Sequence, residues 1–136
     1  GRGSDLELAL RAVYGSLKRR GICVIISDFR AEGYWEALSL LARKHDVVAV
    51  KVYDPAEARF PPAGLMALQD PESRESLWAD GGSPAFRRAY DRSWSEHHEA
   101  WLDNCRRRGV ETLAMSTSED PVVELTRFFR RRRQRG

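Results

Sequence analysis

The sequence has 136 residues, 42% of them hydrophobic and 32% charged, which is typical of one globular domain and includes no apolar run long enough to cross a bilayer. The net charge is +3, but six of the 23 basic residues are arginines between positions 127 and 135, and the rest of the chain carries a net charge of −3. Because this basicity belongs to one tail, the composition argues against nucleic-acid binding.

The first half of the chain alternates helical and strand patterns. Apolar residues at helical spacing predict a helix over residues 5–20, with Ser4-Asp5-Leu6-Glu7 as a capping box and Gly21 just after its end. Residues 22–26 form a short apolar run, which is typical of a parallel strand covered on both faces. A second helix is predicted from Tyr34 to Ala42, and a second strand over residues 47–53.

The second half begins with a break at Asp54-Pro55. Apolar stretches at residues 65–68 and 76–79 predict a short antiparallel hairpin. A long helix should run from Pro84 to Arg107, with Phe86, Tyr90, Trp94, Trp101 and Cys105 on its inner stripe. A third strand is expected over residues 110–115. A last helix should then carry Pro121 in its first turn and be capped by Ser118 or Asp120.

This alternation predicts an α/β fold, with residues 1–136 forming a single domain. The expected architecture is a three-layer open sheet, mainly parallel, with an antiparallel hairpin. In such sheets the loops after the strands gather at one edge, where ligands bind. Ser27-Asp28, Tyr53-Asp54 and Ser116-Thr117 should therefore emerge together. Their oxygens suit magnesium or calcium, although Asp28 and Asp54 could instead cap turns through their side chains.

The cysteines and histidines indicate neither a disulfide framework nor a zinc site. Cys23 falls in an apolar strand and Cys105 in the long helix, so a reducing, cytoplasmic setting is the simpler interpretation. His97 falls on the apolar stripe of its helix, His98 lies beside it, and His45 closes another helix. These positions do not have the spacing that zinc ligands require.

Several short motifs, in this order along the chain, resemble the bacterial family known as domain of unknown function 58. They are Gly3-Ser4-Asp5-Leu6, Ile26-Ser27-Asp28-Phe29, His45-Asp46-Val47, Asp54-Pro55-Ala56-Glu57, Pro61 with Gly64, Asp70-Pro71-Glu72 and Ser116-Thr117. That family is similar to the von Willebrand factor type A fold, a doubly wound α/β domain related to Rossmann-like sheets, which can hold a divalent ion at a metal-ion-dependent adhesion site. The resemblance implies that this chain, which has no initiator methionine, is the C-terminal portion of such a domain.

The resemblance assigns Ser4 to the hydroxyl ligand and Asp28 to the acid of the adhesion site, with Ser27, Asp54 and Thr117 as further edge-loop residues. The Asp-x-Ser-x-Ser loop of the site has no counterpart here, so we expect no cofactor on this chain and Mg²⁺ only in the full-length protein. Phe29 stands where metal-binding relatives commonly have glycine after the acid. Arg74 stands at a hairpin position where this family often has glycine.

The function that we expect is a non-enzymatic protein-protein interaction module. Members of the resembled family are commonly encoded near MoxR-type AAA+ ATPases, which implies a protein partner of that type and a role in complex assembly or maturation. Many members carry transmembrane helices ahead of this part, so the parent protein could be membrane-anchored. The alternative is a metal-dependent hydrolase that uses Asp28 and Asp54 with His45. We further expect the isolated chain to self-associate through residues 22–27, which would lie at an open sheet edge.

Overall fold

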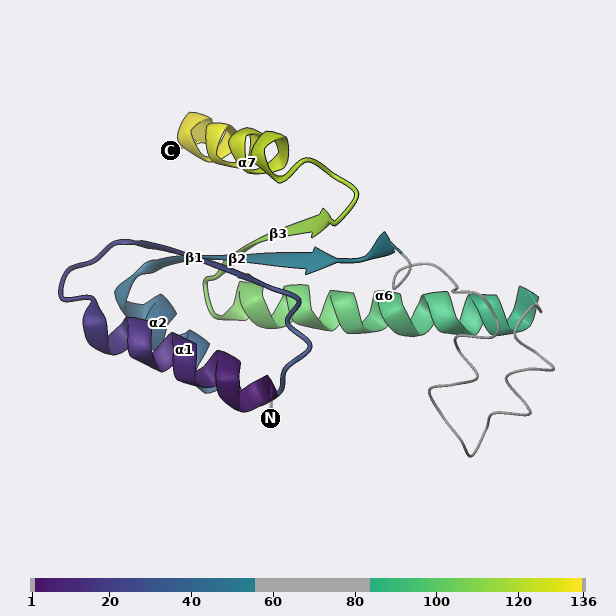
Figure 1. The fold of residues 1–136 in the computed structure, drawn as a ribbon, viewed down its shortest axis with the longest axis horizontal. Coiled ribbons are helices and arrows are strands. Elements are labelled where there is room, and N and C mark those ends of the chain that lie inside the picture. The colour runs from purple at the N-terminus through teal and green to yellow at the C-terminus, as the bar shows by residue number, and fades with distance from the viewer. Residues whose placement is uncertain (1, 56–83, 136) are drawn as a thin grey trace. The chain divides into compact units, whose positions relative to one another are not determined.

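The structure is a computed structural model that describes residues 2–55 and 84–135 (Figure 1). The predicted hairpin over residues 65–79, together with Arg74, lies outside these residues. Within them the chain forms four helices and three strands, in an α/β order. They are α1 (Arg2–Ser16), β1 (Ile22–Ser27), α2 (Trp35–Lys44), β2 (Asp46–Tyr53), α6 (Pro84–Arg107), β3 (Glu111–Ser116) and α7 (Pro121–Arg135).

The chain divides into two compact units, which are described separately. The first contains residues 1–53 and 102–136, and therefore all three described strands, and the second contains residues 54–101. The sheet is parallel throughout, in the order β1-β2-β3, with Ile22 level with Asp46 and Val48 level with Glu111. The expectation of a mainly parallel sheet is thus confirmed for the described strands.

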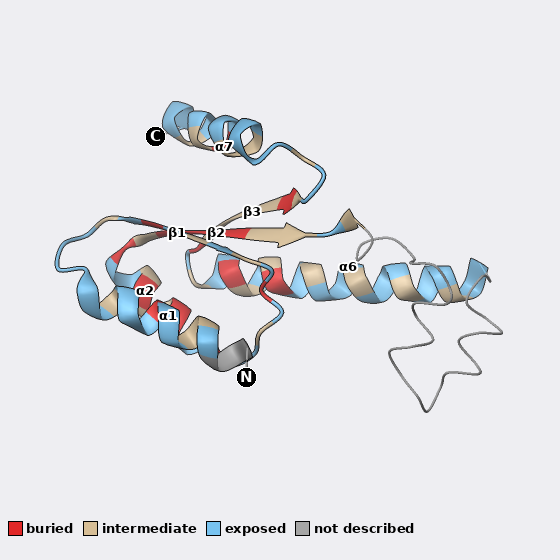
Figure 2. Cartoon of the chain, in the orientation of Figure 1, coloured by how far each residue is buried: buried red, intermediate tan, exposed pale blue. Residues whose placement is uncertain are grey.

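The register assigns alternate residues to the two faces of the sheet. On one face, Val48, Val50 and Met115 form a core with Phe128 of α7, and Leu125 and Phe129 pack against it. The other face carries the buried residues Cys23, Val47 and Ala49, on the side of the sheet where Figure 1 shows α1 and α2. Helices therefore lie on both faces of the sheet, and Figure 2 shows buried residues along β2 and α2 while the outer side of α7 is exposed.

Strand β1 differs from the prediction on one face. Ile22, Val24 and Ile26 are 62%, 40% and 58% exposed, whereas Cys23 between them is buried. The register aligns these three residues with the face that α7 covers over β2 and β3. The prediction that this run is covered on both faces is therefore wrong for the described residues, because α7 does not cover β1.

Helix α1 is shifted toward the N-terminus relative to the prediction. It begins at Arg2, so Ser4 lies inside the first turns and cannot be the N-cap, and it ends at Ser16. Leu10 is buried on its inner side, while Leu17 lies after the helix and is 40% exposed. Residues 17–20 belong to the connection into β1, whereas the prediction includes them in the helix.

The other two helices of the first unit agree better with the sequence. Helix α2 buries Ala37, Leu38 and Leu41 and ends at Lys44, close to the predicted boundary. The start of α7 resolves the alternative between two capping residues, because Asp120 Oδ1 accepts the N–H of Val122 at 2.9 Å. Pro121 occupies the first helical position, where its missing N–H has no cost.

The second unit contains most of α6. Its less exposed stripe contains Phe86, Tyr90 and Trp94 and reaches the buried residue Trp101 at the end of this unit. Cys105, the last predicted member of the stripe, lies in the first unit and is also buried. His98, not His97, completes this stripe, because its ring stacks at 5.1 Å from Trp94 and 5.8 Å from Trp101. His97 is exposed, and its Nδ1 contacts the carbonyl of Ser93 at 2.8 Å. None of the helices in the described ranges combines the length and hydropathy that a bilayer crossing needs.

Candidate functional site

The carboxyl end of β1 forms a tight polar turn. Ser27 is the last residue of the strand, and its hydroxyl oxygen accepts the N–H of Phe29 at 3.0 Å. The Asp28 carboxylate accepts the N–H of Arg30 at 3.1 Å through Oδ1. The turn-capping interpretation of Asp28 is therefore correct for one oxygen. The second oxygen has no hydrogen bond or ion pair with the described residues, and Asp28 is exposed to solvent.

Phe29 gives this turn an unusual backbone. Its φ is +53°, in the left-handed region where a side chain on Cα is strained and glycine is favoured. Its ring is 8% exposed and lies 5.7 Å from that of Tyr34. Burial of the ring offsets the backbone strain, which explains how phenylalanine occupies a position that suits glycine.

A shallow hollow of about 330 Å³ lies beside this turn. It is lined by Asp5 and Leu6 of α1, by Ile26, Ser27 and Asp28 at the end of β1, and by Ala31. Two exposed carboxylates and an exposed isoleucine therefore meet at one opening. Such a surface offers an apolar contact beside acidic groups that can accept hydrogen bonds from a bound partner.

The other predicted site residues occupy separate positions. Ser4 lies on α1, one residue before Asp5. Thr117 follows β3 at the same edge of the sheet as Asp28 and donates its N–H to the carbonyl of Tyr53 at 2.9 Å. Two strand spacings separate β3 from β1, so Thr117 lies roughly 10 Å or more from Asp28. Asp54 directly follows β2 and belongs to the second unit.

His45 lies at the opposite edge of the sheet, as its position before β2 predicts. It is 3% exposed, and its Nδ1 accepts the N–H of Gly21 at 3.1 Å. Asp28 is six residues further along β1 than the level of Asp46, which corresponds to roughly 20 Å. His45 and Asp28 therefore cannot exchange a proton, and His45 instead holds the connection into β1.

The described residues of the hollow do not fit a magnesium ion. Magnesium needs about six oxygen ligands in an octahedron, with carboxylates to offset its dehydration. Ser27 and Oδ1 of Asp28 already accept backbone hydrogen bonds. No group of three or more histidine, cysteine or acidic side chains within residues 2–55 and 84–135 is arranged to hold a metal ion.

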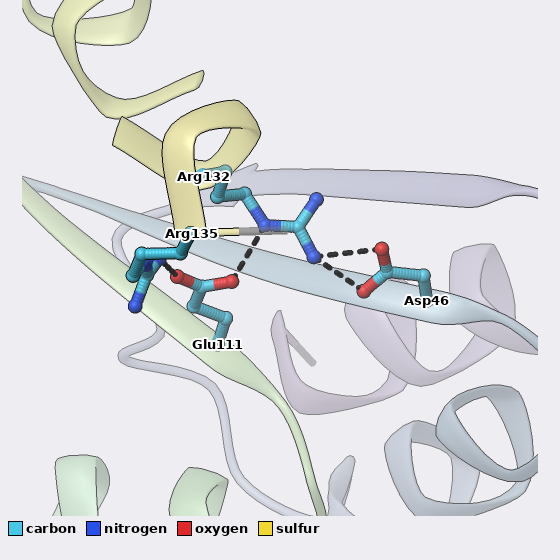
Figure 3. Close-up of polar contacts among 4 residues, drawn as sticks. All are labelled: Asp46, Glu111, Arg132 and Arg135. Carbon is cyan, nitrogen blue, oxygen red and sulfur yellow. Dashed lines mark hydrogen bonds and ion pairs between the residues drawn. The ribbon is translucent and has the colours of Figure 1, made fainter. Parts of the chain in front are cut away.

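The amino edge of the sheet carries an ion-pair network that joins two strands to α7 (Figure 3). Nη2 of Arg132 lies 2.7 Å from both oxygens of Asp46, the first residue of β2, and its Nε donates to Glu111 at 2.6 Å. Arg135 contacts the other oxygen of Glu111. One guanidinium thus ties together the first residues of β2 and β3.

The network shifts the ionisation of its members. Partial burial by itself raises the pKa of the Glu111 carboxyl, but hydrogen bonds from Arg135 and Arg132 outweigh it and hold that pKa below its ordinary value. Hydrogen bonds to Asp46 and Glu111 raise the pKa of Arg132. Both shifts favour the charged forms of Glu111 and Arg132, so the network acts as a clamp at neutral pH.

The sequence reasoning missed two features of these edges. Asp5 was assigned only to a capping box, although its place in the Gly3-Ser4-Asp5-Leu6 motif was a signal for the hollow. From the sequence, the basic residues of positions 127–135 are assigned only to a tail, whereas Arg132 and Arg135 pair with acids of the sheet. The pairing of Arg132 with Asp46 spans 86 residues, so no local spacing could reveal it.

Comparison with known proteins identifies relatives but no characterised one. The chain is 34% identical over 134 residues to the uncharacterized proteins Mb1516 of Mycobacterium bovis and Rv1480 of Mycobacterium tuberculosis, with 96% of this chain and 41% of each relative covered. It is 30% identical to the uncharacterized protein MAV169 of Mycobacterium avium, covering 77% of that protein. No solved structure matches. Residues 1–100 match the family described as "Protein of unknown function DUF58", and the chain therefore belongs to that family.

Proposed function

We propose that this chain is a protein-recognition module, and that the hollow beside Asp28 is its contact surface. The observation that carries the proposal is the exposed Asp28 carboxylate, which keeps one oxygen available beside Asp5 and the exposed side chain of Ile26. An acid beside an apolar side chain suits a protein partner that presents a basic group next to an apolar one.

The proposal extends to the whole protein. A parallel sheet with helices on both faces and oxygen-bearing loops at its carboxyl edge is consistent with part of a von Willebrand factor type A-like domain. In that reading Ser4 and Asp28 belong to an incomplete adhesion site, and other parts of the protein supply further ligands for Mg²⁺. The chain spans 41% of the length of the M. tuberculosis relative, which leaves room for such parts.

The partner that we propose is a MoxR-type AAA+ ATPase, which the module would assist in complex assembly or maturation. A cytoplasmic position suits this partner. It also suits Cys23 and Cys105, which are both buried and free.

The test is binding of this chain to a purified MoxR-type ATPase, measured by biolayer interferometry. Asp28→Asn and Asp5→Asn should each weaken binding by about fivefold, the scale of one exposed charge pair. Glu99→Gln removes one exposed acid from α6 that does not line the hollow, and is the matched control. Equal effects of all three variants would show that only overall charge matters, and would refute the assignment of the hollow.

A magnesium titration compares ion binding by this chain with ion binding by the longer protein. In heteronuclear NMR spectra, the amides of residues 27–30 should not respond to Mg²⁺ in this chain and should respond in the longer protein. A saturable response in this chain alone would mean that its own residues bind the ion, contrary to the donor set described above.

Strand β1 is an edge of the described sheet, and this supports a second part of the proposal, in which two copies of the chain pair through residues 22–27. This segment contains no charge, proline or glycine, the usual devices that protect an edge strand, and its outer face is apolar. Sedimentation should show association that rises with concentration and is lost in Val24→Lys. A monomer at all concentrations would refute the pairing. It would not affect the proposal for the Asp28 surface, which the binding measurement tests separately.

A further inference from the structure

Strand β3 forms the second edge of the described sheet, and part of its backbone has no partner there. The N–H of Thr117 is bonded to Tyr53 of β2, and consecutive residues of a strand point their backbone groups to opposite sides. Thr112, Ala114 and Ser116 therefore direct theirs away from β2. The N–H of Ser116 confirms this direction, because it is bonded to Oε1 of Glu119 at 2.7 Å.

The Glu119 carboxylate closes one end of this edge and leaves the rest open. It occupies the outward N–H nearest the carboxyl end of β3. Among residues 2–55 and 84–135, no group accepts from or donates to the outward N–H and C=O of Thr112 and Ala114. An added strand could therefore pair with β3 from Glu111 to about Met115.

A groove of about 450 Å³ runs beside this open edge, between β3 and α7. Its β3 side is formed by Glu111, Thr112 and Leu113, and its α7 side by Phe128, Arg131, Gln134 and Arg135. Phe128 is 5% exposed and belongs to the core, with Leu113 packed against it, so the groove has an apolar floor.

The rim of the groove is basic. Arg131 is exposed and makes no ion pair or hydrogen bond with the described residues. Arg132 and Arg135 are ion-paired with Asp46 and Glu111, whereas Arg131 interacts with Glu124 only through space and is the groove-lining arginine without an ion pair among the described residues. Because Arg135 contacts the first residue of β3, the basic end of the groove lies at the beginning of that strand.

We propose that an extended peptide segment of a partner protein docks in this groove, pairs with β3 as an added strand and places an acidic side chain on Arg131. Backbone pairing with Thr112 and Ala114 supplies affinity, and the apolar floor accepts a side chain of the peptide. The charge of Arg131 selects the acid. This surface is separate from the hollow beside Asp28, so the inference does not depend on the proposed function.

The probe is a pair of fluorescein-labelled peptide pools of about six residues, the common length of a strand. Both pools alternate β-branched and polar residues, and they differ only in a central glutamate or a central lysine. Fluorescence anisotropy should show saturable binding that favours the glutamate pool. Hydrogen exchange of the bound chain should show new protection at the amides of Thr112 and Ala114.

Two variants and a control test the geometry. Arg131→Glu should weaken binding of the glutamate pool by about fivefold and make the lysine pool the better ligand. Ala114→Pro removes one outward N–H at an edge position that tolerates proline, and should abolish the strand pairing. Arg130→Glu makes the same charge change on an exposed neighbour that does not line the groove, and should change binding by less than about twofold.

The inference is overturned if neither pool binds, or if Arg131→Glu and Arg130→Glu have equal effects. It is also overturned if the new exchange protection falls at residues 22–27, which would assign peptide binding to the opposite edge of the sheet. The Arg131→Glu result keeps the test decisive even if Ala114→Pro does not fold, because Arg131 is an exposed surface residue.

Discussion

Replacement of Arg132 by methionine tests the clamp at the amino edge of the sheet. Methionine keeps much of the length of the side chain and removes its contacts with Asp46 and Glu111. Hydrogen bonds to charged groups contribute about 1.5–3 kcal/mol each when buried. The side chains here are 20%, 35% and 29% exposed for Arg132, Asp46 and Glu111, so solvent screens both contacts. We expect Arg132→Met to lower the free energy of unfolding by about 2 kcal/mol in total, measured by urea denaturation.

The control is Arg133→Met, one position along α7, whose exposed guanidinium has no acidic partner among the described residues. Its effect should remain within about 0.5 kcal/mol, as for most surface substitutions. Adding Asp46→Asn to Arg132→Met should cost less than Asp46→Asn costs alone, because the shared contact is already lost. Equal effects of Arg132→Met and Arg133→Met would refute the clamp.

Further substitutions test the remaining features of the fold. Because the pKa of Glu111 is lowered in the folded chain, its contribution to stability is present at neutral pH and is lost as the pH falls through the folded pKa. Glu111→Gln should therefore make the acid-side loss of stability shallower in urea titrations between about pH 3 and pH 7. Since φ of Phe29 is positive, Phe29→Ala should lower the melting temperature more than Phe29→Gly, by the equivalent of about 1 kcal/mol, and a more stable alanine variant would contradict the strained turn. His45→Phe leaves the N–H of Gly21 without its acceptor and should cost about 1–2 kcal/mol in urea unfolding, and an unchanged midpoint would show that this hydrogen bond has no weight. Burial raises the pKa of the Cys105 thiol to about 11, so an aromatic disulfide reagent at about pH 8 should modify it only at the rate of unfolding, and rapid modification of the native chain would contradict its burial.

The sequence predicts the order and type of the described elements well, because their signals are local. The apolar run that begins at Ile22, the stripe that ends at Cys105 and the proline at position 121 each indicate one kind of element within a few residues. The boundaries of α1 are less well predicted. Ser4 is a good N-cap by residue type, but the helix extends past it to Arg2.

The candidate site is only partly predictable. Ser27 and Asp28 emerge at the carboxyl edge because a strand ends there, and this follows from the pattern alone. The large distance between His45 and Asp28 also follows from the pattern, because His45 precedes a strand and Asp28 follows one. The exposure of Ile26, the pairing of Arg132 and the groove beside Arg131 depend on where α7 lies over the sheet. That placement is a tertiary property, which no spacing along the chain encodes.

Strands β2 and β3 are neighbours in the sheet although residues 54–110 separate them along the chain. The entropy lost on closing such a connection grows only with the logarithm of its length, by about 0.6 kcal/mol for each doubling. Members of the family can therefore lengthen or shorten this connection during evolution while keeping the same pairing of β2 with β3. We expect differences in length between relatives to concentrate there, and the short turns around residues 27–34 and 116–120 to keep theirs.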